Sequence, residues 1–432
     1  MSYRKAHVGW SLTALIAIAV LCTFPQPSSA MPAFAREYGI SCNVCHAAYP
    51  RLNSFGAQFQ SDMNYRLPNW PDHTVKTGDD MLRLPEQVPL ALRMQAYIQG
   101  RDSEAVDVQT GEAVADAGVD FQAPYLIKLL SSAPLSDHIS YYFYAIFAEK
   151  GGNGEVIVED AWFSHDDLFG TGITGMLGQF QLSDLMFPRE TRMTFQDFMV
   201  YRMAGVTYDR GVVFGGDLGP LDLALGFSNG NGIEQNFTIN SPGYKRPDHM
   251  FDNNTGKSVF GRVGATLGGL DIGLFGLSGK QRNATGPAGM DSGDRDTDKV
   301  SAGVDLSGTI GTKWHLFGQL LWNRWDGFLD PDVTYEWNGG FAGVDYIHSD
   351  KWVFSALVNY NDAGDFDNTD TVYEGIDMQT VTFTASYYFM RNVKGLIEVN
   401  ADLLSTKAQD GTYFTGHLDK DNYILIGFDA AF

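Results

Sequence analysis

Between Val88 and Phe432, hydrophobic and polar residues alternate with a period of two in segments of about ten residues. In residues 351–362, one face reads Trp352, Phe354, Ala356, Val358 and Tyr360, and the other reads Lys351, Val353, Ser355, Leu357, Asn359 and Asn361. In residues 393–404, Ile397 and Val399 alternate with Glu398 and Asn400. A period of two is that of a β-strand, whose successive side chains point to opposite faces. A carboxylate in mid-strand needs water on its side, so these segments predict strands between water and an apolar medium.

Short and long connections alternate between the predicted strands. The short ones are "LGPL" near Gly219, "LGGL" near Gly268, "IGTK" near Gly311, "SDK" near Asp350 and "RNVK" near Asn392. The long polar ones are residues 229–257, 280–299, 327–339, 362–377 and 405–421. Tight turns at one end and long loops at the other are typical of an outer-membrane β-barrel. The alternative is a soluble β-sandwich, in which such regular alternation is rare.

Counting the alternating segments predicts an all-β transmembrane barrel of about 16 antiparallel strands, within a range of 14–18. The predicted strands start near Val88, Phe121, Ile139, Val156, Ile173, Ala204, Leu221, Ser258, Leu270, Lys299, Lys313, Phe341, Lys351, Met378, Val393 and Asp421. An even number places the N-terminus and the C-terminus on the same, periplasmic side of the membrane. A barrel of this size has a lumen wide enough for an aqueous channel or a plug.

The final residues, "DNYILIGFDAAF", place Ile424, Ile426, Phe428, Ala430 and Phe432 on one face. A last strand that ends on an aromatic residue resembles the C-terminal signal by which bacterial outer-membrane barrels are recognised for assembly. Aromatic residues also gather near strand ends, where membrane proteins carry interfacial girdles; they include Trp322, Trp325 and Trp352. Both features favour the membrane barrel over the sandwich.

The N-terminus has the pattern of a secretory signal peptide. Arg4 and Lys5 precede an apolar run over residues 10–24, and small residues follow up to Ala30. We expect cleavage after Ala30, with Ala35 as the alternative. A transmembrane anchor would need about 20 apolar residues, more than this run offers. The chain is therefore predicted to comprise a signal peptide (1–30), a short segment (31–86) and the barrel (87–432).

The segment 31–86 contains "CNVCH", in which His46 directly follows the second cysteine of a Cys42–Cys45 pair. The third cysteine, Cys22, would leave with the signal peptide. A disulfide across so short a loop stabilises almost nothing, a zinc site needs further ligands, and no βαβ context favours a thioredoxin-like pair. The spacing instead indicates covalent attachment of one haem c through both thiols, with His46 as the proximal iron ligand.

The second axial ligand stays open at this point. Met63, His73 and Met81 are the candidates, and Met94 lies inside a predicted strand. Each of them also has an ordinary structural explanation in packing or in a solvated loop. A helix is expected over residues 49–64, followed by prolines. So short a segment buries too little surface to enclose a haem alone. We therefore expect a short α-helical haem segment that plugs the lumen and relies on the barrel to complete its surroundings.

The stretch "MPAFAREYGISCNVCHAAYPRLNSFGAQFQ" resembles the N-terminus of the fused monohaem cytochrome c–porin family of outer-membrane proteins, which includes Fe(II) oxidases. The likeness rests on the export signal, the haem motif, the PxLxxFG pattern (Pro50, Leu52, Phe55, Gly56) and a single barrel with a terminal Phe. It implies that electrons pass between extracellular Fe(II), or another redox metal, and periplasmic cytochromes or other carriers. Direction stays open, because transfer outward to a metal acceptor fits equally well. A porin-type transport channel gated by the haem segment is the second hypothesis.

The charge of the chain changes this picture little. Its formal net charge is −22, which argues against nucleic-acid partners, since these need a basic surface. An acidic mouth would attract cations, and acidic stretches occur at residues 291–298 and 362–370. Solvated outer loops explain these stretches equally well. The remaining histidines are scattered and do not predict a second metal site.

Overall fold

The computed structural model describes residues 32–70, 74–79, 81–101, 105–106, 113–115, 118–148, 156–230, 255–282, 296–367, 369, 373, 376–404 and 422–432. The predicted signal peptide and His73 lie outside these residues. So do most of the predicted long loops at 229–257, 280–299 and 405–421.

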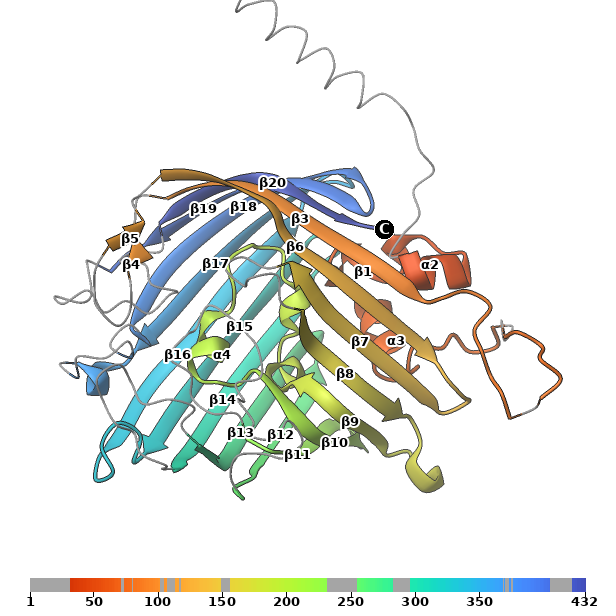
Figure 1. Cartoon of the computed structure of the whole chain (residues 1–432), viewed down its shortest axis with the longest axis horizontal. Helices are drawn as coiled ribbons and strands as arrows, with labels where there is room; N and C mark the ends of the chain where they lie inside the picture. Colours follow the sequence, from red (N-terminus) through yellow and green to blue (C-terminus); the bar gives the residue numbers. More distant parts are fainter. Residues whose placement is uncertain are drawn as a thin grey trace, which may run out of the picture.

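Antiparallel strands form a closed barrel. In the view of Figure 1 the strands run obliquely. In chain order the barrel strands are β3 (Leu90–Arg101), β6 (Gly118–Pro134), β7 (Ile139–Ala148), β8 (Ile157–His165), β9 (Thr174–Gln181), β10 (Tyr208–Leu218), β11 (Leu221–Ser228), β12 (Ser258–Leu267), β13 (Leu270–Arg282), β14 (Asp296–Ile310), β15 (Trp314–Asp326), β16 (Thr334–Ile347), β17 (Trp352–Asp362), β18 (Met378–Met390), β19 (Val393–Asp402) and β20 (Tyr423–Ala431). Pairing of β20 with β3, in the register Ile426 to Ile98, closes the ring. The described barrel thus has the 16 strands that the sequence predicts.

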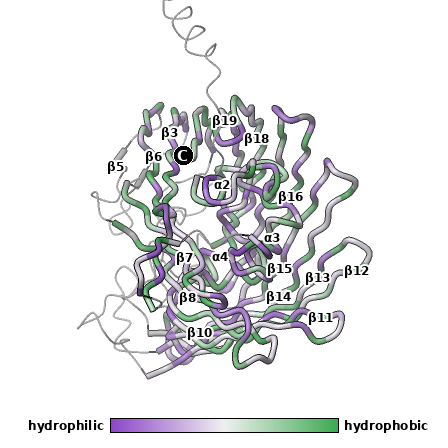
Figure 2. Tube along the Cα trace, turned by 90° about the vertical axis from the view of Figure 1, so that its right-hand side faces the viewer, coloured by the Kyte–Doolittle hydropathy of each residue, from purple (hydrophilic) through white to green (hydrophobic). Residues whose placement is uncertain are grey.

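The two faces of each strand follow the alternation of the sequence. On β20, Ile424, Ile426 and Phe428 face outward and are about half exposed, whereas Leu425 and Asp429 are buried on the inside. On β19 the carboxylate of Glu398 points into the lumen and is fully buried. The alternation of hydrophilic and hydrophobic positions can be followed along the strand traces in Figure 2. An outer face of apolar side chains around a polar interior is the pattern of a barrel surrounded by lipid.

Two predicted strand starts are wrong. Strand β16 begins at Thr334 and not near Phe341, which shortens the loop predicted over residues 327–339. Its first residues put Tyr335 and Trp337 inside and Glu336 outside. The strand extends beyond the apolar band that the outward-facing side chains of the barrel form. Its outward positions there are polar, so this part of the sequence resembles a loop. Strand β10 begins at Tyr208 and not near Ala204 because the preceding residues fold into the lumen.

The chain before the barrel, residues 32–89, is called the N-terminal segment here. It contains α2 (Pro32–Tyr38), the 3₁₀ turn η1 (Cys42–Val44), the paired short strands β1 (His46–Ala48) and β2 (Arg51–Leu52), and α3 (Ser54–Gln60). The helix predicted over residues 49–64 is therefore shortened. Asn53 ends the extended stretch and caps α3, since its side chain accepts a hydrogen bond from the N–H of Gly56. None of the helices in the described residues has the length and apolar character of a membrane-crossing helix.

The N-terminal segment is held at the end of the barrel where the short turns lie. Asn64 donates to the carbonyl of His138 (3.0 Å), and its own carbonyl accepts from the hydroxyl of Ser140 (2.6 Å). Arg51 forms an ion pair with the inward carboxylate of Asp345, on the other side of the ring. The last residue, Phe432, pairs through its backbone with Leu92 at the same end. The junction of this segment with β3 and the C-terminus therefore lie at one end of the barrel.

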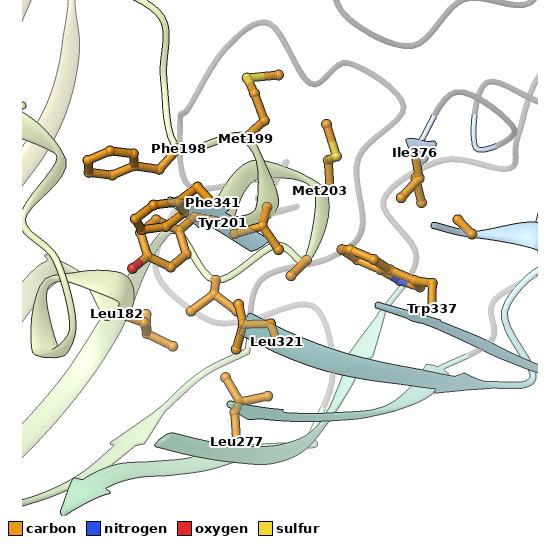
Figure 3. Close-up of a cluster of buried hydrophobic side chains, with 14 of the residues drawn as sticks. Leu182, Phe198, Met199, Tyr201, Met203, Leu277, Leu321, Trp337, Phe341 and Ile376 are labelled. Carbon is orange, nitrogen blue, oxygen red and sulfur yellow. The ribbon is translucent and has the colours of Figure 1, made fainter. Parts of the chain in front are cut away.

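A second segment, residues 182–207, connects β9 to β10 through the interior; we call it the lumen segment (Figure 1). It contains η3 (Leu182–Leu185), η4 (Arg189–Thr191) and α4 (Met199–Met203). The ring of Phe198 stacks on Phe341 of β16 at 4.2 Å (Figure 3). Tyr201 donates to Gln319 of β15. The sequence analysis assigned no role to this segment.

Other residues of the lumen segment reach the opposite walls. The backbone N–H groups of Phe195 and Gln196 donate to Glu398 of β19 at 2.6 and 2.8 Å. Glu190 forms ion pairs with Lys128 of β6 and Arg93 of β3. Because β3 and β6 lie across the ring from β15 and β16, the segment spans the lumen. Its apolar residues and the walls form one buried core cluster.

Candidate functional site

A cavity of about 190 Å³, partly open to solvent, lies between the N-terminal segment, the barrel wall and the lumen segment. Cys42, Cys45 and His46 all line it. The wall is completed by residues of β3, β6, β7 and β8 and by the η3–η4 stretch of the lumen segment, among them Arg93, Leu130, Tyr142, Trp162 and Glu190. The three motif residues therefore face one enclosed space to which distant parts of the chain contribute.

The turn that carries the cysteines is fixed by Asn53. The N–H of Cys45 donates to the carbonyl of Cys42 (3.2 Å), which closes the 3₁₀ turn. The backbone N–H of Asn53 donates to the carbonyl of Cys45 (2.9 Å), and its side-chain amide donates to the carbonyl of Val44 (2.9 Å). One residue thus caps α3 and holds the Cys-x-x-Cys turn against the start of that helix.

The imidazole of His46 is oriented by the chain that follows it. Its Nδ1 lies 3.0 Å from the carbonyl oxygen of Pro50, which accepts a hydrogen bond from Nδ1–H in the tautomer that leaves Nε2 unprotonated. A metal-binding histidine is commonly fixed in this way through its other ring nitrogen. Burial lowers the pKa of His46 and so favours the neutral imidazole, which is the form that binds a metal.

Neither Cys42 nor Cys45 forms a disulfide among the described residues. Burial raises the pKa of Cys45, and the neighbouring Cys42 adds to this effect. A raised pKa keeps the thiol protonated and makes it a poor nucleophile on its own. The pair therefore lacks the environment of a reactive redox dithiol, in which the thiolate is stabilised.

Gly56 permits the close approach between α3 and the motif turn. A Cβ atom at this position would overlap the carbonyl group of Cys45. The atom that it would meet belongs to the backbone and cannot move away without displacing the turn. The glycine of the PxLxxFG pattern is thus required by packing against the second cysteine.

We expect Gly56→Ala to displace the motif turn at a cost of about 1–3 kcal/mol, the usual range for overpacking. Covalent haem per chain, measured from the pyridine haemochrome spectrum, should fall several-fold. Gly276→Ala is the matched control, since nothing lies within 4 Å of a Cβ atom there. Equal haem contents in the two variants would contradict the packing role of Gly56.

Six aromatic residues contribute to the apolar lining: Phe34, Tyr49, Phe59, Tyr65, Tyr142 and Trp162. Tyr65 stacks on Tyr142 of β7 with ring centroids 6.1 Å apart, and Tyr142 stacks on Trp162 of β8 at 5.3 Å. Phe59 of α3 meets Phe34 of α2 edge to face at 5.1 Å. These contacts tie the N-terminal segment to β7 and β8 and give the cavity a flat-sided, apolar wall.

Charged groups lie on the side of the cavity formed by the lumen segment. Glu190 accepts from Lys128 at 2.8 Å and from Arg93 at 3.4 Å. Burial alone would disfavour its charge, but the two cations hold the pKa of Glu190 at about 2. The guanidinium of Arg93 also pairs with Asp429 at 2.7 Å and lies 5.3 Å from the ring centroid of Tyr49. Asp160 and Asp184 line the same cavity.

The described candidates for the distal ligand, Met63, Met81 and Met94, do not line the cavity that the motif residues line. Met63 is half-buried against the aromatic cluster of Tyr38, Phe59 and Tyr65 and does not line the cavity. Met81 is 96% exposed and Met94 is 38% exposed on β3, whereas His73 lies outside the described residues. The structure thus brings Cys42, Cys45 and His46 together, and the identity of a distal ligand stays a prediction.

Four further residues that line the cavity were not predicted from the sequence: Arg93, Asp160, Asp184 and Glu190. On β3 and β8 the available signal is a charged residue at an inward position of a strand. In the lumen segment no sequence signal distinguishes Asp184 and Glu190 from the carboxylates of ordinary loops.

Comparisons with known proteins identify the fold. No family model matches this chain, and no curated protein matches it in sequence. Among solved structures it is similar to the outer membrane channel DcaP of Acinetobacter baumannii, with a TM-score of 0.54 and 13% identity over 80% of this chain and 97% of that one. The anion-selective porin from Comamonas acidovorans gives a TM-score of 0.52 and 14% identity over 80% and 99% of the two chains.

The trimer form of OmpT, an outer membrane protein of Vibrio cholerae, gives the same TM-score of 0.52 and 14% identity, over 80% of this chain and 99% of that one. All three likenesses are below the identity at which a shared function follows from a shared fold. The chain therefore has the closed 16-strand architecture of the outer membrane porins.

Proposed function

We propose that this protein is an outer-membrane barrel that carries one covalent haem c in its N-terminal segment and passes single electrons across the membrane. The observation that carries the proposal is the cavity, because Cys42, Cys45 and His46 line a single space enclosed by the barrel and the lumen segment. The sequence resemblance to fused cytochrome–porins supports the same reading. By that resemblance the donor is extracellular Fe(II) or another redox metal, and the acceptors are periplasmic carriers.

The residues present fit a haem. The cavity is lined by the motif residues together with residues of the barrel wall and the lumen segment, so it extends well beyond the motif turn. Its aromatic walls suit the face of a macrocycle, the two thiols form no disulfide among the described residues, and the hydrogen bond to Pro50 directs Nε2 of His46 away from its own backbone. When bound, the group supplies a one-electron iron couple. Cys42 and Cys45 would anchor it, and His46 would bind its iron.

The chain's own residues would set the behaviour of that couple. The aromatic wall of Tyr65, Tyr142 and Trp162 limits the access of water to the cavity. Excluding water lowers the local dielectric constant, and charge interactions near the cofactor become stronger. Glu190 supplies a fixed negative charge, because Lys128 and Arg93 keep it ionised. A negative charge beside the cofactor stabilises the oxidised form and lowers the potential.

The second hypothesis, a transport channel, draws support from the shared fold with porins. The lumen segment favours electron transfer, since among the described residues it forms a buried cluster with the walls where porins of this size leave an aqueous channel. An electron can cross a packed interior, whereas a solute needs an open path. The described interior therefore suits a carrier of electrons better than a passage for solutes.

The proposed location is the bacterial outer membrane, with both chain ends on the periplasmic side. The short turns and the backbone of Phe432 lie at the same end as the N-terminal segment, in accord with this orientation. In that arrangement the motif turn lies near the periplasmic carriers and the long loops face the outside.

Stopped-flow mixing of the purified protein with Fe(II) tests the proposal. We expect a haem c spectrum in the isolated protein and growth of its reduced α-band after mixing. If the α-band does not appear at any pH from about 3 to about 7, Fe(II) is not the donor. Protein that folds in membranes but contains no covalent haem would refute the electron-transfer function itself.

A further inference from the structure

The cavity wall also carries two carboxylates, Asp160 and Asp184, which differ from Glu190 in their charged partners. Asp160 projects from β8 and Asp184 from η3, and both line the cavity. Asp160 is 6% exposed, whereas the side chain of Asp184 has open surface toward the cavity. Two residues that are distant in the sequence from the haem motif thus place acidic groups on the wall of the cavity that the motif also lines.

Neither carboxylate forms an ion pair with a lysine or arginine among the described residues, whereas Glu190 has two such partners. Asp184 is close to Arg189 and accepts a hydrogen bond from its backbone, but the guanidinium of Arg189 is committed to Asp197 through Nε at 2.9 Å. Asp160 accepts a hydrogen bond from Trp162. Two carboxylates that share a site without a cation disfavour double ionisation.

The electrostatic surroundings of the pair come from every element packed around it. They are Glu159 on β8, Arg189 and Glu190 on η4, Tyr142 on β7, Tyr201 on α4, Tyr208 on β10, and Tyr65 of the N-terminal segment. The ionised neighbour Glu190 adds negative charge, and the tyrosines remain neutral. Asp184 keeps open surface toward the cavity, but the protein packed around it removes water and raises its pKa; Arg189 opposes this shift and Glu190 adds to it.

We propose that the Asp160–Asp184 pair is a redox-linked proton acceptor, which takes up one proton when the proposed haem gains an electron and releases it when the electron leaves. This inference rests on the proposed function. The arriving electron adds negative charge to a low-dielectric space. A carboxylate oxygen of the pair then forms an O–H bond with a proton from water in the open part of the cavity. On oxidation that bond breaks, and the proton returns to water.

The sign of the pH dependence follows from this exchange. Protons bind more tightly to the pair in the reduced protein than in the oxidised protein, so reduction becomes less favourable as pH rises. Between the pKa values of the pair in the two states, the midpoint potential should fall by about 59 mV per pH unit, the value for one electron and a tenfold change in proton concentration. Above and below that interval the potential should be constant.

Spectroelectrochemical titration of the haem-loaded protein from about pH 5 to about pH 9 tests the inference. In the wild type the midpoint should fall with pH as described. Asp184→Asn and Asp160→Asn should each flatten this slope. Glu190→Gln is the matched control: it removes a carboxylate that stays ionised, so it should raise the potential, move the pH-dependent interval to lower pH and leave the slope within that interval intact.

A midpoint that does not change with pH in haem-loaded wild-type protein would overturn the proton coupling and leave the proposed function standing. A slope that persists in both aspartate variants would also overturn it. Absence of covalent haem would overturn both proposals. If the variants do not fold, the redox-induced infrared difference spectrum of the wild type decides, because a carbonyl band of a protonated carboxylic acid should appear on reduction, and its absence would overturn the coupling.

Discussion

The double variant Cys42→Ala/Cys45→Ala is expected to assemble as a barrel and to carry no covalent haem. The barrel is closed by strand pairing from β3 to β20 and by contacts of the lumen segment, none of which involves the cysteine side chains. The thiols have no disulfide to lose, so their removal costs the barrel little stability. Loss of haem stain on denaturing gels, with unchanged heat-modifiable migration of the folded barrel, would be the measurement.

Cys22→Ala is the matched control, since Cys22 lies in the predicted signal peptide and should leave the mature chain. This variant should retain the full haem content. His46→Ala should keep the thioether bonds and lose the normal low-spin spectrum while the barrel assembles. A wild-type spectrum in His46→Ala would refute the assignment of this residue as the proximal ligand, and covalent haem in the double cysteine variant would refute the attachment site.

Replacing residues 186–203 with a short Gly/Ser linker is expected to convert a closed barrel into a conducting one. This deletion removes Phe198, Tyr201 and Glu190 from the interior and with them the apolar and charged contacts that span the ring. A 16-strand barrel without such a filling has an aqueous channel. Single-channel recordings in planar bilayers should show porin-like conductance in the deletion variant and none in the wild type.

Tyr201→Phe is the control for this experiment. It removes the hydroxyl that donates to Gln319 but keeps the ring that packs against Phe341 at 5.5 Å. This variant should stay closed. Porin-like conductance of the wild-type protein would contradict a closed lumen whether or not the deletion variant folds, and would favour the transport hypothesis.

Much of the barrel can be predicted from the sequence because lipid and water impose a period of two on each strand separately. Ile424, Ile426 and Phe428 face outward as expected, and the number of strands agrees. The prediction fails at β16, where Tyr335 and Trp337 point inward beyond the apolar band. At this end of β16 the strand lies outside the membrane, so its hydrophobic pattern no longer follows the membrane environment. Packing in the barrel interior determines which side chains face inward there.

The haem motif is local in the same sense. Two thiols and an imidazole within five residues indicate haem attachment from the sequence alone, without knowledge of the fold. Asn53 and Gly56 hold that turn through contacts with residues a few positions away in the chain. The helix predicted over residues 49–64 is longer than the observed one, because the paired strands β1 and β2 come first and the helix starts only after its cap, Asn53.

By itself the sequence determined the strands, the alternation of their faces and the Cys-x-x-Cys-His turn, because each depends on neighbours along the chain or on the surrounding solvent. The tertiary structure alone decided that residues 182–207 enter the lumen and that Asp160, Asp184 and Glu190 meet the motif in one cavity. Those contacts join residues more than a hundred positions from the cysteines. They exist only once the ring has closed, so no local pattern in the chain records them.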